Sequence, residues 1–242
     1  MLFTTQGILV RTTDFSESSL IAKIYTRKWG MQSFILKGVK SKRSSIKTAF
    51  LQPLSFLDMV VQYRGNRDLQ IIREARPAFV INTIPYEVQK SSIAMFATEL
   101  IYKTVKEEEA NEALFSFLHS FIQYLDAASA GLGNLPLYFM VEMSRFLGFF
   151  PQEEGGENAM YFRLEEGIFS REGGTEDSII APPASQYLRQ LMDLEMEDPD
   201  ILKIPVAVRH ELMQKMIYYY RLHSDNFHGL RSYEILREVM RK

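Results

Sequence analysis

Cysteine is absent from all 242 residues of the chain. Its absence excludes disulfide scaffolds, thiolate zinc sites, iron–sulfur clusters and cysteine nucleophiles, and it fits a reducing compartment. Long apolar runs are missing too, because none reaches the roughly 18 residues that a membrane span needs. The N-terminal sequence MLFTTQGILVRTTD lacks the basic and apolar regions of a signal peptide. We therefore expect a soluble cytoplasmic protein that does not associate with membranes.

Catalytic signatures are also missing. The sequence contains no GxxxxGK[ST] and no GxSxG motif, and the GxG at residues 131–133 has no third glycine and no preceding strand. His223 and His228 lie five positions apart, but a metal site there would need a further ligand from elsewhere, so surface histidines are the simpler interpretation. These absences predict a protein that is not an enzyme and that carries no cofactor.

Negative charge is scarce in the first third of the chain. Residues 1–80 contain 13 Lys and Arg against 5 Asp and Glu, whereas residues 81–242 contain 15 against 25. Such an asymmetry suggests that the basic part meets a polyanion. The alternative is a chance segregation of charges onto solvated faces.

Residues 1–80 alternate between apolar and polar positions in short segments separated by turn residues, which is typical of strands. Five short strands predict a small barrel, and the gap from Gly38 to Pro53 has room for the short helix of a five-stranded OB barrel. The expected strands are Gly7–Arg11, Leu20–Arg27, Met31–Lys37, Leu54–Tyr63 and Leu69–Arg73.

After Pro77 the apolar spacing becomes helical. We expect an α+β fold, in which a five-stranded OB-type β-barrel (residues 1–80) precedes an α-helical bundle domain (residues 81–242). A small hairpin insertion lies within residues 151–183, where Tyr161–Leu164 and Ile168–Phe169 flank a turn. The six expected helices centre on Ile93–Ile101, Leu114–Leu125, Leu135–Phe150, Tyr187–Leu194, Val206–Leu222 and Leu230–Met240.

The strongest local signal is the segment from Lys37 to Lys47, in which five of eleven residues are basic and none is acidic. Lysine, arginine, serine hydroxyl and main-chain N–H groups are the usual phosphate contacts. A flexible solvated loop is the alternative.

The second strand adds aromatic residues to this basic character. Lys23, Tyr25 and Arg27 share one parity, and Trp29 follows in the next turn. Cations for phosphates and rings for base stacking suit single-stranded nucleic acid, although Tyr25 and Trp29 can equally pack in the barrel. The candidate nucleic-acid-binding residues are Arg11, Lys23, Tyr25, Arg27, Lys37, Lys40, Lys42, Arg43, Lys47, Arg64 and Arg67.

Several motifs, in this order and spacing, resemble the bacterial recombination mediator RecO family. The resemblance runs through the whole chain and is strongest over residues 7–60. The motifs are Gly7-Ile8-Leu9-Val10-Arg11, Asp14, Glu17-Ser18, Ile24-Tyr25-Thr26, Gly30, Lys37-Gly38-Val39-Lys40-Ser41-Lys42, Leu51-Gln52-Pro53-Leu54 and Leu230-Arg231-Ser232-Tyr233-Glu234-Ile235-Leu236-Arg237.

The resemblance implies an N-terminal OB domain and a C-terminal helical domain without enzymatic activity. It implies binding of single- and double-stranded DNA and annealing of complementary strands. The implied partners are RecR and the acidic C-terminal tail of the single-stranded DNA-binding protein, and the implied outcome is help in loading RecA. A bacterial, nucleoid-associated location follows from the same resemblance.

One feature departs from the family pattern. Some members carry a four-cysteine zinc module in the helical domain, and the equivalent stretch here, residues 151–183, contains neither cysteine nor histidine. We expect no zinc, and we expect the hairpin core of Tyr161, Phe162, Leu164, Ile168 and Phe169 to hold the insertion by packing alone.

The implied partner tail is acidic and apolar, so it needs an apolar groove with cations at its rim. The expected helix Val206–Leu222 offers Arg209, Met213, Lys215 and Met216 as candidate tail-binding residues. The alternative is that this stripe packs in the bundle core.

Two other functions remain open. An RNA-binding OB-fold protein of translation or RNA processing fits the basic barrel equally well, and strand annealing of DNA would separate it from a repair mediator. An enzyme or small-ligand protein could use a pocket in the helical domain. A deep pocket lined by clustered carboxylates or histidines would favour that reading.

Overall fold

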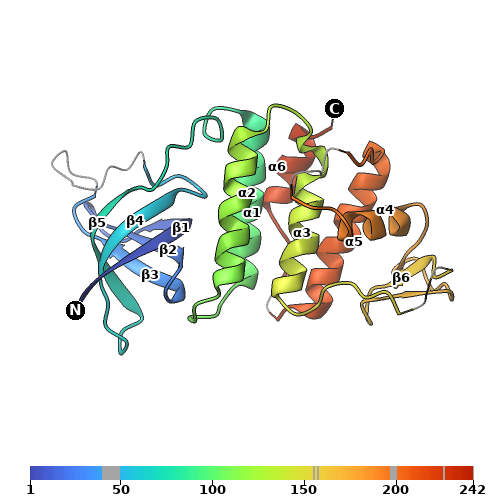
Figure 1. The fold of residues 1–242 in the computed structure, drawn as a ribbon, viewed down its shortest axis with the longest axis horizontal. Helices are drawn as coiled ribbons and strands as arrows, with labels where there is room; N and C mark the ends of the chain where they lie inside the picture. Colours follow the sequence, from blue (N-terminus) through green and yellow to red (C-terminus); the bar gives the residue numbers. More distant parts are fainter. Residues whose placement is uncertain (40–49, 155, 157, 197–200, 226, 242) are drawn as a thin grey trace. The chain divides into compact units, whose positions relative to one another are not determined.

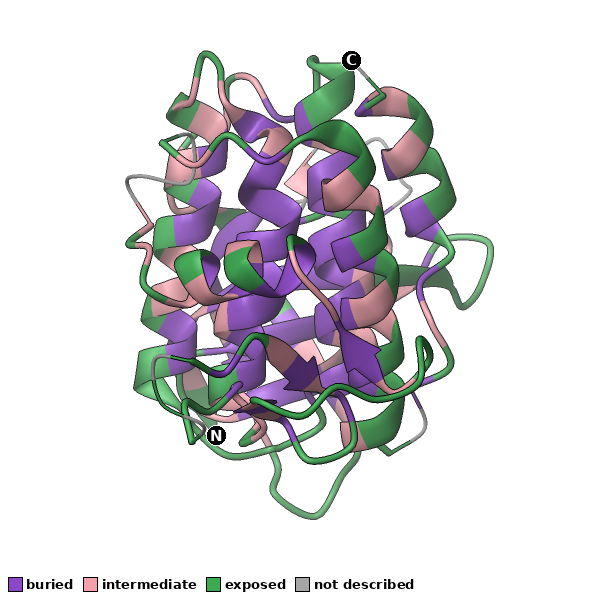
Figure 2. Cartoon of the chain, turned by 90° about the vertical axis from the view of Figure 1, so that its right-hand side faces the viewer, coloured by how far each residue is buried: buried purple, intermediate pink, exposed green. Residues whose placement is uncertain are grey.

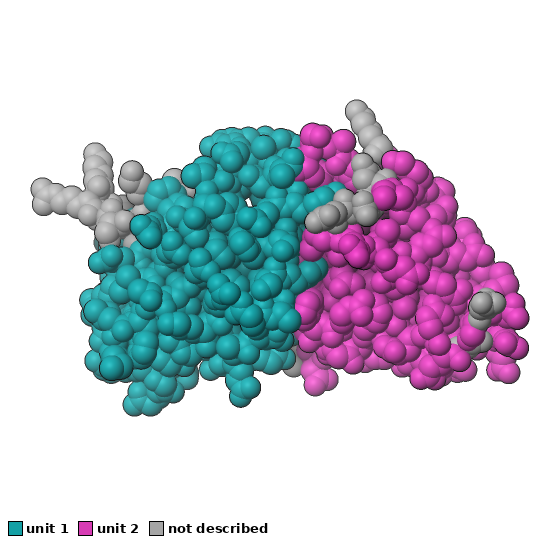
Figure 3. Space-filling model, viewed as in Figure 1, with its two compact units in different colours: residues 1–127 teal, residues 128–242 magenta. Residues whose placement is uncertain are grey.

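The computed structural model describes residues 1–39, 50–154, 156, 158–196, 201–225 and 227–241. In these residues a closed five-stranded β-barrel is followed by six α-helices, which confirms the predicted fold class (Figure 1). The chain divides into two compact units, Met1–Ala127 (unit 1) and Ala128–Lys242 (unit 2), which Figure 3 colours separately. Unit 1 therefore contains two helices in addition to the barrel. The domain boundary near residue 80 stays a prediction.

The barrel contains every strand that the alternation predicts. Its hydrogen-bonded order is β1-β2-β3-β5-β4, and β3 and β5 are the parallel neighbours. β1 extends beyond Gly7–Arg11 at both ends, because its first half pairs with β4 and its second half with β2. The helix expected between β3 and β4 falls mostly on residues 40–49, outside the described part. The strands are β1 (Leu2–Asp14), β2 (Leu20–Thr26), β3 (Gly30–Leu36), β4 (Phe56–Gln62) and β5 (Leu69–Pro77).

Alternate side chains of each strand fill the barrel interior. Gly7 lies where β1 passes from β4 to β2, and a Cβ there would come within 2.5 Å of both the Ile24 and Met59 side chains. Glycine at this position therefore allows close packing at a bend of the strand. The core comprises Leu9, Ala22, Ile24, Phe34, Leu36, Val39, Leu57, Met59, Val61, Ile72 and Ala75.

Two helices of unit 1, α1 (Val88–Thr104) and α2 (Glu112–Ala127), cover part of the outer barrel surface. The Phe115 ring of α2 lies 6.3 Å from Tyr25 and 5.6 Å from Phe56, measured between ring centroids. The barrel is thus apolar on both sides of these strands, inward toward its core and outward toward α2.

Asp126, at the end of α2, fixes the segment that links the barrel to α1. Its carboxylate accepts hydrogen bonds from the backbone N–H groups of Asn82, Thr83 and Ile84, at 2.9, 2.8 and 3.1 Å. Burial alone would raise the pKa of Asp126, but these donors outweigh it and hold the pKa below its ordinary value. The buried ammonium of Lys90 completes the clamp by donating to the Thr83 hydroxyl at 2.7 Å and to the Asp126 carbonyl at 2.9 Å.

Unit 2 is built around α3 (Leu135–Phe146), which is buried along nearly its whole circumference, as predicted. It contacts α4 (Ala184–Met192) and α5 (Val206–His223), while α6 (Ser232–Val239) follows near the C-terminus. Figure 2 shows the buried positions on the inner sides of the helices and the exposed ones outside. α3 ends at Phe146 rather than Phe150, because Gly148 adopts a left-handed conformation with a φ of 86°.

The predicted hairpin is present as β6 (Tyr161–Arg163) and β7 (Ile168–Ser170). A further short strand, β8 (Ile179–Ile180), pairs with β6 and was not expected from the sequence. The rings of Phe162 and Phe169 are buried 5.1 Å apart, and Phe162 also lies 5.3 Å from the Tyr219 ring of α5, so the hairpin packs against the helices of unit 2.

None of the helices in the described part of the chain is long and apolar enough to cross a membrane. Among the same residues, no group of three or more His, Asp or Glu side chains could hold a metal ion.

Candidate nucleic-acid interface

The first two candidates, Arg11 and Lys23, lie opposite each other on β1 and β2. The Arg11 guanidinium sits over the Tyr102 ring of α1, 4.8 Å from its centroid, and Lys23 is half-buried. Arg11 therefore borders α1, and Lys23 lies beside it on the neighbouring strand.

The two aromatic candidates of this region pack inside unit 1. Tyr25 is only 1% exposed, its ring stacks on Phe115, and its hydroxyl donates to the Asn111 carbonyl at 3.4 Å. Burial raises the pKa of Tyr25 to about 12. Trp29 stacks on Tyr63, with ring centroids 4.3 Å apart. The expectation that the Tyr25 ring faces a nucleic acid is therefore corrected, because α2 covers it.

Arg27 is exposed just beyond the end of β2, and it is already engaged. Its Nε and Nη2 atoms donate to the two carboxylate oxygens of Glu112, at 3.0 and 2.5 Å, and its Nη1 donates to Gln6 at 3.2 Å. The hydrogen bonds from Arg27 lower the pKa of Glu112, and Glu112 in turn raises the pKa of Arg27. Both groups are therefore charged at neutral pH.

Lys37, Arg64 and Arg67 are exposed near strand ends. A buried amide holds the turn that carries the two arginines. Gln70, 2% exposed, accepts a hydrogen bond from the Arg64 backbone N–H at 2.8 Å and donates to the Arg64 carbonyl at 2.9 Å. The other candidates of the basic segment, Lys40, Lys42, Arg43 and Lys47, lie outside the described residues.

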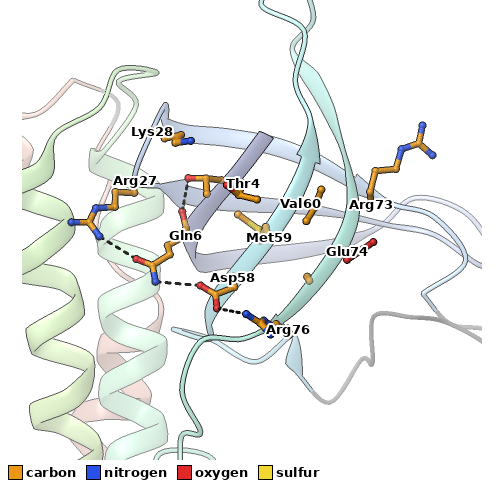
Figure 4. Close-up of a pocket in the computed structure, with 12 residues that line it drawn as sticks. Thr4, Gln6, Arg27, Lys28, Asp58, Met59, Val60, Arg73, Glu74 and Arg76 are labelled. Carbon is orange, nitrogen blue, oxygen red and sulfur yellow. Dashed lines mark hydrogen bonds and ion pairs between the residues drawn. The ribbon is translucent and has the colours of Figure 1, made fainter. Parts of the chain in front are cut away.

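A groove of about 940 Å³ runs over the outer face of β1, β4 and β5, and we call it the barrel groove (Figure 4). Its charged lining is Arg27, Lys28, Arg73, Arg76, Asp58 and Glu74. The groove brings together four cations from two parts of the barrel sequence, the β2–β3 turn and β5. Of these, only Arg27 belongs to the predicted set.

Arg73 and Arg76 were not predicted as binding residues, because a β-bulge interrupts the alternation of β5. Val60 pairs with Glu74 whereas Val61 pairs with Ile72, so an extra residue is inserted at Arg73. Arg73 and Glu74 are consequently both exposed, while Ile72 and Ala75 point into the core. The only sequence signal was two arginines in a strand that also supplies core residues.

Polar side chains link the two sides of the barrel groove. Gln6 on β1 accepts from Arg27 and donates to Asp58 on β4 at 3.2 Å, and Asp58 pairs with Arg76 on β5 at 3.5 Å (Figure 4). Arg73 donates to Gln62 at 2.5 Å. These contacts hold the guanidinium groups along the outer barrel surface, where they can donate to phosphate oxygens.

The four residues expected to bind a partner tail do not form an open groove. Met213 and Met216 are 5% and 0% exposed, so they belong to the core of unit 2. Arg209 donates to the Met240 carbonyl at 3.3 Å, whereas the Lys215 ammonium contacts the Glu176 carbonyl. The tail site on α5 is therefore corrected to the alternative of a core stripe, and its two cations point to different neighbours.

Comparisons with known proteins cover the whole chain. A family model described as "Recombination protein O N terminal" matches residues 1–87, and one described as "Recombination protein O C terminal" matches residues 86–233. The "DNA repair protein RecO" of Phocaeicola vulgatus is 33% identical over 239 residues, covering 99% of each chain. Proteins of the same name from Bacteroides fragilis and Flavobacterium psychrophilum are 32% and 30% identical over 240 residues, also covering 99% of each chain.

Proposed function

The chain belongs to the recombination protein O (RecO) family of DNA repair proteins, and from this membership we propose that it is a DNA-binding recombination mediator without catalytic activity. It binds single- and double-stranded DNA, anneals complementary strands and helps RecA load onto coated single strands. Its proposed partners are RecR and the C-terminal tail of the single-stranded DNA-binding protein.

The barrel groove is the observation that carries the proposal. Four cations line it, and guanidinium groups bind phosphate through paired N–H donors. The groove lies in the basic part of the chain, so the long-range field also favours a polyanion. Since Tyr25 and Trp29 pack within unit 1, backbone contacts rather than base stacking on these rings dominate the proposed interface, and we expect little sequence preference.

The proposed DNA surface combines this groove with exposed cations elsewhere on the barrel. Lys28, Arg73 and Arg76 join the residues proposed from the sequence. Those residues are Arg11, Lys23, Arg27, Lys37, Arg64 and Arg67, together with Lys40, Lys42, Arg43 and Lys47 beyond the described part.

Binding of a labelled oligo-dT strand, followed by fluorescence anisotropy at several salt concentrations, tests the proposal. Lys28→Gln/Arg73→Gln removes two exposed cations of the groove. We expect weaker binding and a plot of log K against log salt that is shallower by about 1.4, since each phosphate contact to a single strand contributes about 0.7. The control Arg171→Gln/Arg221→Gln removes the same charge from exposed positions of unit 2 and should leave binding unchanged.

Strand annealing separates the proposal from its alternative. The protein should accelerate annealing of complementary DNA strands, and the groove variant should be slower than the control variant. Tight binding of an RNA strand together with no DNA annealing would instead support an RNA-binding OB-fold protein.

A further inference from the structure

An acidic segment lies directly beside Arg27 and Lys28, two of the cations that line the barrel groove. Residues 106–112 join α1 to α2 and contain four glutamates and one lysine. The backbone N–H of Met31, at the start of β3, donates to the Glu107 carbonyl at 2.9 Å. The segment is therefore attached to the barrel by its main chain, next to the β2–β3 turn that carries Arg27 and Lys28.

Gly30 allows the backbone of the acidic segment to approach the barrel closely. Its φ is 59°, and a Cβ at this position would lie 2.4 Å from the carbonyl oxygens of both Glu107 and Glu109. Only glycine avoids both the unfavourable backbone region and the overlap. The position of the acidic segment is thus set by backbone contact, and its charges are brought to the groove as a consequence.

Glu112 accepts hydrogen bonds from the same edge of the Arg27 guanidinium that a phosphate would use. The two groups form a paired contact through Nε and Nη2, and the guanidinium also lies 5.7 Å from the centroid of the Phe115 ring. Carboxylate and phosphate present the same acceptor geometry to a guanidinium, so the two ligands exclude each other on this edge. By contrast, neighbouring Lys28 is exposed and forms no hydrogen bond or ion pair with described residues.

We propose that the acidic segment is a built-in competitor of nucleic-acid phosphates, and that a polyanion must displace Glu112 to engage Arg27. This inference rests on the proposed function of the groove and adds its regulation. The Arg27–Glu112 pair is exposed, with side chains 50% and 58% accessible, and such pairs contribute little stability. Exchange of carboxylate for phosphate is therefore feasible without unfolding. Glu107, Glu108 and Glu109 lie within a few residues of the pair and add repulsion toward any polyanion within about one Debye length, roughly 10 Å at 0.1 M salt.

The acidic segment determines how strongly a polyanion must bind to the other cations of the groove before Arg27 also contributes to binding. A ligand with isolated charges gains little by displacing Glu112. A nucleic-acid strand has continuous phosphates. When some of these already contact Lys28, Arg73 and Arg76, the next phosphate is present near Arg27 at high effective concentration. The segment thus favours long strands over scattered anions.

Glu112→Gln tests the inference in the full-length protein. We expect oligo-dT to bind about two- to fivefold tighter in low salt, and the salt plot to steepen by about 0.7 as one more phosphate is neutralised. Glu166→Gln is the matched control, because Glu166 forms a similarly exposed pair with Arg163 at 2.5 Å in unit 2. This control should bind as the unchanged protein does. In an Arg27→Gln background, Glu112→Gln should not steepen the salt plot, because it then frees no guanidinium, and any tightening that remains measures the local repulsion of the Glu112 charge.

A second measurement reports displacement directly. Since the chain has no cysteine, Ala110→Cys carries a single environment-sensitive dye within the acidic segment. Saturating oligo-dT should change its fluorescence, and free phosphate at the same charge concentration should not. Inorganic polyphosphate is included as a polyanion without bases.

The outcomes are distinguishable. Unchanged binding by Glu112→Gln, or no dye response at saturation with a polyanion that does bind, would overturn the competitor. Weaker binding by Glu112→Gln would overturn it as well and make Glu112 a positioning residue for Arg27. If polyphosphate binds and displaces the segment while DNA does not bind, the competitor stands and the proposed function fails.

Discussion

Gly30 shows how a single residue without a side chain can determine the position of a charged segment. Its backbone conformation and its closeness to two carbonyl oxygens make two separate demands. The first is the left-handed φ, which a residue with a Cβ adopts only at a free-energy cost of about 1 kcal/mol. The second is space, which is lacking because the opposing atoms are backbone atoms that cannot rotate away.

We predict that Gly30→Ala destabilises the protein by about 2–4 kcal/mol, since both demands are violated. Gly38→Ala is the control, because Gly38 has a similar φ of 67° but no atom of the described residues within 4 Å of its would-be Cβ. The control should lose only about 1 kcal/mol. Urea denaturation of the two variants measures the difference, and equal losses would show that the contact with residues 107–109 is not tight.

Residues also mark where prediction from sequence stops. The pattern placed Tyr25 and Arg27 on one outward parity, which is correct for the strand, but it could not show that α2 covers Tyr25 while Arg27 lies beyond that cover. Likewise Met213 and Met216 fit an amphipathic stripe, and such a stripe has the same spacing whether a partner or the unit's own core covers it. The choice between these alternatives is made by tertiary packing and not by local pattern.

At the level of elements, α2 and the barrel are coupled through a titratable ring. His119 of α2 stacks on Phe56 of β4, with centroids 4.5 Å apart, and lies 5.7 Å from Phe79. Burial against these rings, with a smaller contribution from the Arg27 charge, lowers the pKa of His119 below its ordinary value of 6.5. Between the lowered and the ordinary value, the unfolded chain binds more protons than the folded one. Stability contributed by His119 is therefore complete above pH 6.5 and is lost as the pH falls through the folded value.

We predict that His119→Phe loses less stability than the unchanged protein between pH 7 and pH 5. Phenylalanine keeps the ring contacts and removes the titration, and carboxylates that titrate in the same range affect both proteins equally. Chemical denaturation at the two pH values gives the comparison. His210→Phe serves as a control in unit 2, where burial also lowers a histidine pKa. An identical pH dependence in His119→Phe and the unchanged protein would contradict the argument.

The elements themselves were largely predictable, and the exceptions have physical reasons. The strands and helices follow apolar periodicity, which reports burial directly. The bulge in β5 breaks that periodicity, so Arg73 and Arg76 were not identified as neighbours of Arg27. β8 has two residues, too few for any period to be visible. The strands were therefore predictable, whereas the groove that forms across them required their register.

For the whole molecule, the charge division of the sequence corresponds only partly to the compact units. The basic barrel carries its own acidic segment within unit 1, so opposite charges meet there and do not merely separate along the chain. Composition could indicate that residues 1–80 meet a polyanion. It could not show that residues 106–112 lie beside those cations, because that contact depends on how the chain turns back.

We expect chelators to leave the stability of the whole protein unchanged. With no thiolate in the sequence, the insertion depends on the packing of Phe162 and Phe169, and Phe162→Ala should cost about 3–5 kcal/mol of unfolding free energy. EDTA should leave the melting temperature unchanged, and elemental analysis should find no stoichiometric zinc. One equivalent of tightly held zinc would contradict this prediction.

The double pairing of β1 has a consequence for how the barrel assembles during synthesis. Its second half can form a hairpin with β2 as soon as Leu20 has followed Asp14, and such local hairpins form within microseconds. Its first half must wait for β4, because Leu2 pairs with Gln62. Closure also needs the parallel pairing of Ser33 with Leu69. On the ribosome, the first half of β1 therefore remains an open strand edge until β4 has emerged, and that interval is when the barrel is most exposed to aggregation.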